Sequence, residues 1–191
     1  PARIPQLEEA RDFADMRQDI GQLLNGSRDA RSRVRKIVQD LKDFSHVDAT
    51  ADWQWVDLRR GLESTLNIVN NEIKYKADVI KEFGELPQIQ CMPSQLNQVF
   101  MNLFVNAAHA MPDNVRGTIT VRTGQRDHEI WIEVSDTGSG MPPEVMQRIF
   151  EPFFTTKPAG EGIGLGLSLS YDLIKAHGGE MKFESEHGSG S

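Results

Sequence analysis

The stretch QLNQVFMNLFVNAAHAM, residues 95–111, decides the class of fold. Apolar side chains occupy nearly every turn of it, so a helix formed here would be buried almost all round. The polar side chains form one stripe, all within about 40° of Asn102 on a helical wheel: Gln95, Gln98, Asn102, Asn106 and His109. A stripe that simply faces solvent would be expected to carry Lys, Glu or Arg, which are better helix formers than Asn. We therefore expect the stripe to line a site, where amide oxygens suit a hard cation already held by an anionic ligand such as a triphosphate.

The segments around this helix predict an α+β fold. Strands are expected at 53–56, 89–91, 118–123, 130–134 and 181–186, helices at 58–69, 142–150 and 165–177, and an apolar run at 79–83. Asp57 is placed to cap the first helix, Pro93 can open the helix that ends at Met111, and Gly178 follows the last helix. Helices interleaved with hairpin-like strands indicate a mixed, mostly antiparallel sheet covered by helices on one face.

Two glycine-rich loops follow the long helix. In DTGSGM, residues 136–141, Asp136 stands at the end of an expected strand, and Gly138 and Gly140 allow a ligand to approach the backbone. Alone this motif would be a tight turn. The Asp-Thr-Gly-Ser pattern of aspartic proteases would need a second carboxylate from another copy or from a dimer mate, and the chain holds no second copy. In GEGIGLGL, residues 160–167, the loop runs into a helix whose free N–H groups and positive dipole end suit phosphate. This loop has neither the Walker A pattern nor the spacing of a dinucleotide-binding loop.

Between the two loops lies FEPFFTTKP, residues 150–158. One interpretation is a small apolar plug that seats a loop. The other is a lid whose phenylalanines anchor its base, while Thr155, Thr156 and Lys157 reach for phosphate. The flanking glycines favour a lid that is mobile over 155–160 until a nucleotide binds.

Four motifs, in this order, resemble the N, G1, F and G2 boxes of sensor histidine kinases: Asn102-x-x-x-Asn106-Ala107, Asp136-x-Gly138-x-Gly140, Phe150-Glu151-Pro152-Phe153-Phe154 and Gly162-x-Gly164-x-Gly166-Leu167. The resemblance covers about Trp53 to Ser191. It implies the Bergerat ATP-binding fold, a two-layer sandwich shared with type II topoisomerases and MutL. The implied activity is that of an ATP-dependent protein-histidine kinase, which uses ATP and Mg²⁺ and passes the γ-phosphoryl group to a histidine and later to a response-regulator aspartate.

The resemblance also implies roles for single residues. Asp136 would bind the adenine amino group, and Asn106, with Asn102, would bind magnesium. Gln98, one turn before Asn102, stands where a catalytic or orienting polar group would be expected beside Asn102. The remaining residues expected at the nucleotide lie on the glycine loops, the lid and the end of the long helix: His109, Gly138, Gly140, Thr155, Thr156, Lys157, Gly162, Gly164, Leu165, Gly166 and Leu167.

Residues 1–50 are expected to form a separate helical region. Val34, Ile37, Val38, Leu41 and Phe44 recur three or four residues apart, as on one face of a helix that must pack against another. By the resemblance, this region is part of a dimerisation and phosphotransfer segment, and residues 51–191 are the catalytic domain without its last strand. None of the five histidines has the context of the phosphoacceptor motif, a histidine followed by an acidic residue and often by Asn-Pro. His128-Glu129 has the acidic neighbour, but it lies at the turn expected between two strands. We therefore expect a phosphoacceptor histidine outside the chain, a homodimer formed through the N-terminal helices of the intact kinase, and a receiver domain as partner.

Composition narrows the classes of function. The chain has 191 residues, a net charge of −7 and one cysteine. The acidic balance disfavours a nucleic-acid partner, and nearby acids balance the basic cluster at 28–36. A lone cysteine allows no internal disulfide, and no apolar run approaches the roughly 20 residues that span a membrane. We expect a cytoplasmic domain that meets a membrane only through regions outside this chain. The alternative function is a nucleotide-sensing interaction module of the same fold without kinase activity.

Overall fold

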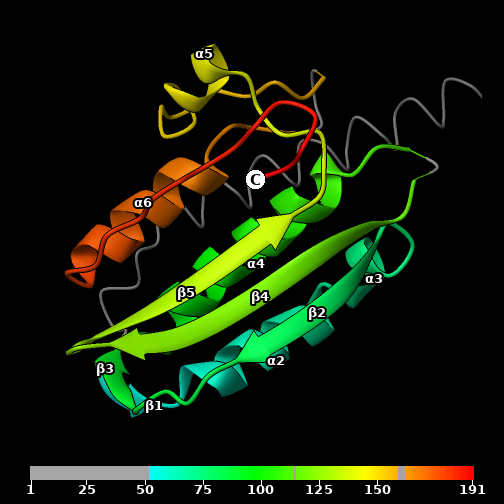
Figure 1. Ribbon diagram of the computed structural model, residues 1–191. Helices are drawn as coiled ribbons and strands as arrows, with labels where there is room; N and C mark the ends of the chain where they lie inside the picture. Colours follow the sequence, from blue (N-terminus) through cyan, green and yellow to red (C-terminus); the bar gives the residue numbers. More distant parts are fainter. Residues whose placement is uncertain (1–51, 114, 159–161) are drawn as a thin grey trace, which may run out of the picture.

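The computed structural model describes residues 52–113, 115–158 and 162–191, so the region expected to dimerise lies outside the described residues. The elements follow one another as β1 (Gln54–Val56), α2 (Leu58–Ile68), α3 (Asn70–Ile73), β2 (Ala77–Phe83), β3 (Ile89–Cys91), α4 (Pro93–Ala110), β4 (Gly117–Arg126), β5 (Glu129–Asp136), α5 (Pro143–Met146) and α6 (Gly166–Ala176). Helices and strands alternate as predicted, and they form two layers, with α2 and α4 behind the large sheet in Figure 1. The α+β sandwich expected from the sequence is therefore confirmed.

The large sheet is mixed and has the strand order β2-β4-β5. β2 runs parallel to β4, with Ala77 opposite Gly117, whereas β4 and β5 form an antiparallel hairpin. The hairpin turns at Asp127, whose φ of 55° lies in the left-handed region that Asp tolerates better than most residues. β1 and β3 pair separately as an antiparallel ribbon. Two of the three strand pairings are thus antiparallel, and the parallel pair in the large sheet requires a crossover through α4.

One core joins α2, α4 and the inner face of the sheet. Leu62 and Phe104, from the two helices, and Ile119, from β4, are all fully buried within it. A smaller cluster joins α4 to α6 through Val99 and Leu169. The outer face of the sheet is polar in contrast, and there the guanidinium of Arg122 pairs with carboxylates from both neighbouring strands. This division explains why β4 alternates between apolar and polar residues over most of its length.

Local chemistry fixes several helix ends. The Asp57 side chain accepts a hydrogen bond from Arg59 N–H at 3.0 Å and caps α2, and Pro93 occupies the first turn of α4. Gly178 has a φ of +76° just beyond α6 and ends that helix, as predicted. Met92 N–H donates to His177 Nε2 at 3.1 Å, which ties the end of α6 to the start of α4. The two helices therefore run antiparallel.

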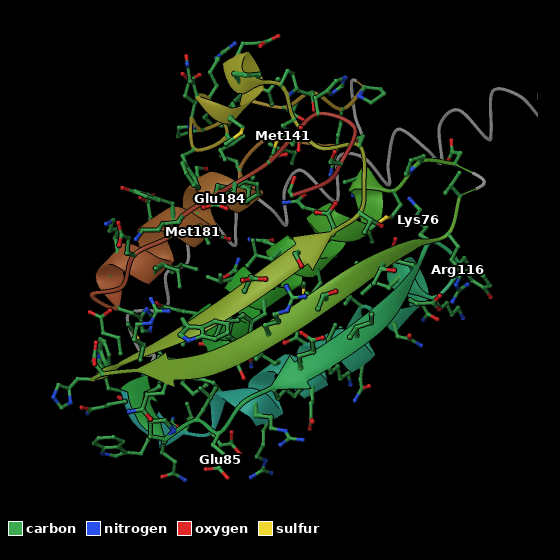
Figure 2. The ribbon with its side chains drawn as sticks, in the orientation of Figure 1. Lys76, Glu85, Arg116, Met141, Met181 and Glu184 are labelled. Carbon is green, nitrogen blue, oxygen red and sulfur yellow. The ribbon has the colours of Figure 1, made fainter. Side chains whose placement is uncertain are left out.

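Two expected elements differ in the structure. The helix predicted at 142–150 is regular only over Pro143–Met146, because the chain then continues in i→i+3 turns such as Arg148 N–H to Val145 O. The strand predicted at 181–186 does not form, although its side chains alternate between half-buried and exposed as in a strand. Figure 2 labels Met181 and Glu184 on this segment. Among the described residues, the segment makes only one isolated β-bridge, between Glu186 and Gly190, and it pairs with no neighbouring strand.

Candidate functional site

Asn102, Asn106 and His109 lie half-buried on the C-terminal half of α4. Three segments that are distant in the sequence meet this half of the helix. They are the loop that follows β5, the segment at 150–158 and the start of α6. The C-terminal part of the predicted stripe, formed by Asn102, Asn106 and His109, thus lies where these segments meet, whereas Gln95 is buried at the other end of the helix.

Asn102 ties α4 to the glycine-rich loop. Its Nδ2 donates to Gly166 O at 3.1 Å and to Ser170 Oγ at 3.2 Å. The Ser170 hydroxyl also donates to Gly166 O at 2.8 Å, so three groups converge on the first turn of α6. The amide nitrogen of Asn102 is therefore engaged in holding α6, and only its Oδ1 can serve a metal. The pattern on the helical wheel identified Asn102 but could not predict this packing role.

Lys157 brings a positive charge to the other two polar residues of α4. Its Nζ lies 3.3 Å from Asn106 Oδ1, to which it donates, and 2.9 Å from His109 Nδ1. An ammonium group has only donors, so both of these atoms act as acceptors toward it. The position beside Asn106 therefore accepts a cation, which is what a magnesium site at this amide would require.

The carboxyl of Asp136 is half-buried at the end of β5. Its Oδ1 accepts a hydrogen bond from Gly138 N–H at 2.8 Å, and Ser139 N–H donates to Ala110 O at 2.9 Å, which fixes the loop to the end of α4. Burial raises the pKa of this carboxyl, and the hydrogen bond from Gly138 opposes the rise. A Cβ at position 138 would lie 2.7 Å from Asp136 Oδ1 and from Ala110 O, so glycine is required there. The loop thus presents a carboxylate with one oxygen held by its own backbone.

The last residues of the chain support this loop from the other side. Asp136 N–H donates to Ser191 O at 2.7 Å, and Gly188 N–H donates to Ser139 O at 2.7 Å. Ser185 Oγ accepts from Met141 N–H at 2.8 Å and donates to Gly190 O at 2.9 Å. The sequence contained no signal for this role of Ser185, because the hydroxyl lies in a segment that looked like an ordinary strand.

The segment at 150–158 is joined to the glycine-rich loop by backbone contacts. Phe153 N–H donates to Gly164 O at 2.9 Å, and Gly164 has a φ of +73°. A Cβ on Gly164 would collide with the backbone of Phe153 and Phe154. The glycine is therefore required by the chain itself, in addition to any role toward phosphate.

The phenylalanines of this segment only partly anchor it. Phe150 packs on Tyr171 of α6 with ring centroids 4.9 Å apart, and the Arg148 guanidinium lies 4.2 Å from the Phe154 ring. Phe153 is 63% exposed and has a φ of 68°, which is unusual for a bulky residue. The expectation that all three rings anchor the base of a lid is therefore wrong for Phe153. The mobility predicted for 155–160 stays a prediction, and residues 159 and 160 of that range lie outside the described residues.

The remaining predicted residues lie at the edges of this arrangement. Leu165 is buried, Leu167 and Gly162 are half-buried and Thr156 is exposed. Gln98 is half-buried one turn before Asn102, and within the described residues it makes no side-chain hydrogen bond. Gly140 has a φ of +60° and packs against the Glu186 backbone. The structure therefore leaves the roles of these residues toward a nucleotide as predictions.

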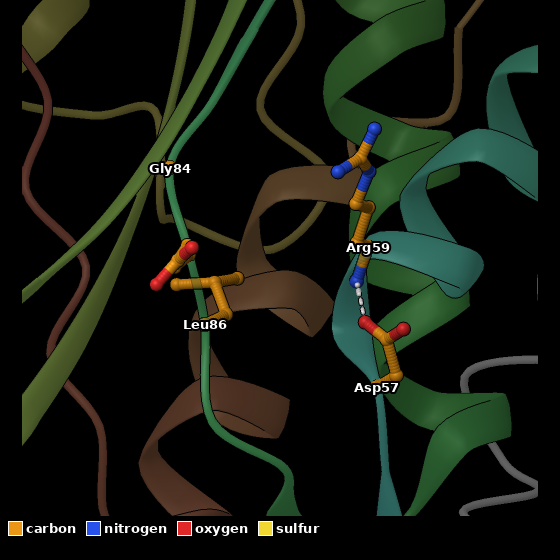
Figure 3. A pocket seen from close by; sticks show the side chains of 5 residues that line it. Asp57, Arg59, Gly84 and Leu86 are labelled. Carbon is orange, nitrogen blue, oxygen red and sulfur yellow. Dashed lines mark hydrogen bonds between the residues drawn. The ribbon is translucent and has the colours of Figure 1, made fainter.

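A separate hollow has a volume of about 320 Å³. It is lined by Asp57, Arg59, Gly84, Glu85 and Leu86, and Figure 3 shows Asp57 and Arg59 on one side and the loop that follows β2 on the other. Asp57 and Arg59 already have partners within the chain, since Asp57 caps α2 and Arg59 pairs with Glu63 at 3.3 Å. None of the sequence-predicted site residues lines this hollow.

In the part of the chain that the structure describes, no three His, Cys, Asp or Glu side chains gather as a metal centre. A metal at the α4 site would therefore depend on amide oxygens and on the oxygens of a bound ligand. Among the same residues, no helix combines the length and the apolar character that crossing a membrane needs.

The chain is similar in sequence to known proteins. Residues 91–191 match the family described as histidine kinase-, DNA gyrase B-, and HSP90-like ATPase. The chain is 37% identical to Sporulation kinase E of Bacillus subtilis over 135 residues, which is 68% of this chain and 18% of that protein. It is 36% identical to the signal transduction histidine-protein kinase AtoS of Escherichia coli over 161 residues, which is 83% of this chain and 26% of that protein.

A solved structure is also similar to this chain in fold. Full-length ShkA in complex with AMPPNP superposes with a TM-score of 0.69 at 27% identity, over 81% of this chain and 33% of that chain. The chain spans about a quarter or less of the length of the two kinases above. Because the family match covers more than half of the sequence and includes all four motifs, the chain belongs to the histidine kinase-, DNA gyrase B- and HSP90-like ATPases, and its described part is the ATP-binding catalytic domain of a sensor histidine kinase.

Proposed function

We propose that this domain binds Mg-ATP over the C-terminal half of α4 and delivers the γ-phosphoryl group to a histidine outside the chain. The phosphoryl group would then pass to an aspartate of a response-regulator receiver domain. One observation carries the proposal. Three segments that are distant in the sequence, the loop after β5, the segment at 150–158 and the start of α6, converge on the asparagine motif of α4 through the hydrogen bonds of Ser139, Lys157 and Asn102.

Each part of the site has a distinct task in this proposal. Asp136 accepts a hydrogen bond from the adenine amino group, because its second oxygen is not used by the Gly138 N–H. The free N–H groups at the start of α6 receive phosphate oxygens, since no side chain caps that helix. Lys157 and His109 supply further contacts to the phosphates, and Gln98 orients the reacting groups.

Asn106, with the Oδ1 of Asn102, would hold magnesium beside the phosphates. Bound there, the metal would neutralise the charge of the phosphates and fix their orientation. The protein side chains contribute mainly by positioning the reacting groups, which can remove a large part of the barrier to phosphoryl transfer. No carboxylate ligand is needed, since the triphosphate itself supplies anionic oxygens.

The partners follow from the family. We infer that the intact kinase dimerises through its N-terminal helices, that its partner is a receiver domain, and that the catalytic domain works in the cytoplasm. The relatives matched by this chain are several times longer, so sensing and anchoring would be tasks of other regions.

Transfer to a separate protein tests the proposal. The chain is incubated with Mg²⁺ and γ-labelled ATP, together with dimerisation domains that carry a phosphoacceptor histidine and are taken from its kinase relatives. We expect an acid-labile, alkali-stable label on at least one added domain and none on the five histidines of the chain itself. ATP binding without any transfer would favour a nucleotide-sensing module instead, and label on His46 would place the acceptor within the chain.

A further inference from the structure

Lys157 occupies the position that the proposed function gives to the metal. Its ammonium lies 3.3 Å from Asn106 Oδ1, the oxygen assigned to magnesium. A magnesium ion would approach such an oxygen to about 2.1 Å. Two cations sharing one amide oxygen would repel each other strongly at such a separation. The ammonium and the metal therefore cannot both use Asn106 in this arrangement.

The position of Lys157 is prepared by several residues. His109 Nδ1 accepts from the ammonium at 2.9 Å, and Lys157 N–H donates to Thr155 Oγ1 at 3.1 Å, which turns the backbone back toward α4. A Cβ on Gly162 would lie 3.1 Å from Lys157 Cδ, tighter than ordinary packing. The missing side chain at 162 thus leaves room for the aliphatic part of Lys157. We call this position of Lys157 its seat; it is formed by Asn106, His109, Thr155 and Gly162.

We propose that Lys157 is the resident cation of the nucleotide-free site and that it alternates with the divalent metal at Asn106. This inference rests on the proposed function. In the empty domain the ammonium satisfies Asn106 and His109. When phosphates arrive, the ammonium moves from the amide oxygen to the phosphates, and the position at Asn106 becomes available to the metal. The metal would therefore take its position with the nucleotide or after it, and not before it.

The exchange predicts how ATP binding depends on metal. Without a divalent ion, Lys157 remains close enough to neutralise part of the phosphate charge, so wild-type protein should retain much of its affinity for ATP. Without both Lys157 and the metal, neither of the two cations offsets that charge. The two cations should therefore compensate for each other, and removing either should make the other more important.

The experiment measures the dissociation constant of ATP by calorimetry, once with excess Mg²⁺ and once with EDTA. The measured quantity is the ratio of the EDTA value to the Mg²⁺ value. For Lys157→Met we expect a ratio about tenfold larger than for wild type, because the unit charge lost near the phosphates weighs more when no metal is bound to neutralise them. Lys157→Arg, which keeps the charge, should restore most of the wild-type ratio. Lys175→Met, on the exposed end of α6, is the matched control and should leave the ratio unchanged.

An unchanged ratio in Lys157→Met, with normal ATP binding by the wild type, would overturn the exchange and leave the proposed function intact. Failure of wild-type protein to bind ATP with Mg²⁺ would overturn the proposed function itself. A second measurement needs no nucleotide. The nitrogen resonances of the His109 ring and of the Asn106 side chain should shift in Lys157→Met, and also in Gly162→Ala, which crowds the seat. If these resonances do not move in the empty domain, Lys157 does not occupy the seat and the proposal fails.

Discussion

At the scale of single residues, Asp136 lowers the stability of the domain when no ligand is bound. The carboxyl of Asp136 is half-buried, and the burial raises its pKa. Gly138 compensates in part through one backbone hydrogen bond. The second oxygen of this carboxylate can accept a hydrogen bond from a ligand. Keeping a partly buried carboxylate ionised lowers the stability of the ligand-free domain.

The first prediction concerns ATP affinity. Asp136→Asn replaces one carboxylate oxygen by an amide group that can donate, so the hydrogen bond from the adenine amino group is lost. Loss of a charge-assisted bond should weaken ATP binding by about 1.5–3 kcal/mol. Calorimetric titration with ATP measures this, and GTP serves as the control because guanine carries no amino group at that ring position. Equal ATP affinity in the variant and the wild type would remove Asp136 from the site.

The same substitution should stabilise the protein without ligand. Because the pKa of the folded carboxyl is raised above 3.8, the folded state binds this proton more tightly than the unfolded state. Ionisation at higher pH therefore costs stability, and the cost disappears as the pH falls to the ordinary range of the carboxyl. Denaturant unfolding should show Asp136→Asn to be more stable than wild type at pH 7, with a smaller difference toward pH 4. A difference that grows as the pH falls would contradict this assignment.

A pair of glycines offers a matched comparison. Gly164→Ala should destabilise the domain by about 1–2 kcal/mol or more, because a left-handed backbone is unfavourable for Ala and because the new Cβ meets the Phe153–Phe154 backbone. At Gly166 the nearest atoms to a Cβ belong to Asn102 at 3.6 Å, which is ordinary contact. Gly166→Ala, at the start of α6, should be neutral or gain about 0.4–1 kcal/mol. Urea unfolding of both variants decides the order.

At the scale of elements, α4 serves the core and the site with different residues. Phe104 and Ala108 face the core, whereas Asn102 and Asn106 face α6 and Lys157. Gln95 belongs to neither group. It is only 4% exposed, and within the described residues neither polar atom of its amide has a hydrogen-bond partner.

Gln95→Met should therefore stabilise the domain. Methionine is close to glutamine in size, and it removes a buried amide whose unmade hydrogen bonds cost about 1–3 kcal/mol. The free energy of unfolding should rise by roughly 1 kcal/mol or more. Gln98→Met, three residues on and half-buried, is the control and should change little. A loss of stability in Gln95→Met would mean that the amide has a partner in the folded protein.

Prediction from the sequence succeeded for elements whose signals are local. Asp57, Pro93 and Gly178 act within one turn of a helix end, and the structure places each end where they predicted it. In the segment at 181–186, half-buried and exposed side chains alternate as they do in a strand. A strand also needs a neighbouring strand to share its backbone hydrogen bonds, and the alternation of side chains does not show whether such a neighbour exists.

At the scale of the whole molecule, the sequence predicted which motifs would meet and missed how they are held. The spacing of Asn102 and Asn106 indicated a common face of α4. The bonds of Asn102 to α6 and of Ser185 to Met141, in the loop after β5, connect residues more than forty positions apart, so no local pattern could indicate them. The site is therefore recognisable from its motifs, while its support becomes visible only in the fold.

The parallel pairing of β2 with β4 has a further consequence, for the order of folding. β4 and β5 are joined by a turn at Asp127, so their pairing closes a short loop and needs no other element. β2 can pair with β4 only after the chain has passed through β3 and α4, and this larger loop loses more conformational entropy on closing. Contacts of the hairpin should therefore form before those of β2.

Unfolding and refolding rates test this order. Val79, on β2, and Val134, on β5, are both half-buried against the same core, and truncating either to Ala should cost about 1 kcal/mol. In Val134→Ala the loss should appear mainly as slower folding. In Val79→Ala it should appear mainly as faster unfolding, because β2 joins the sheet after the transition state. Stopped-flow measurements across a range of urea concentrations separate the two, and slower folding in Val79→Ala would place β2 in the nucleus instead.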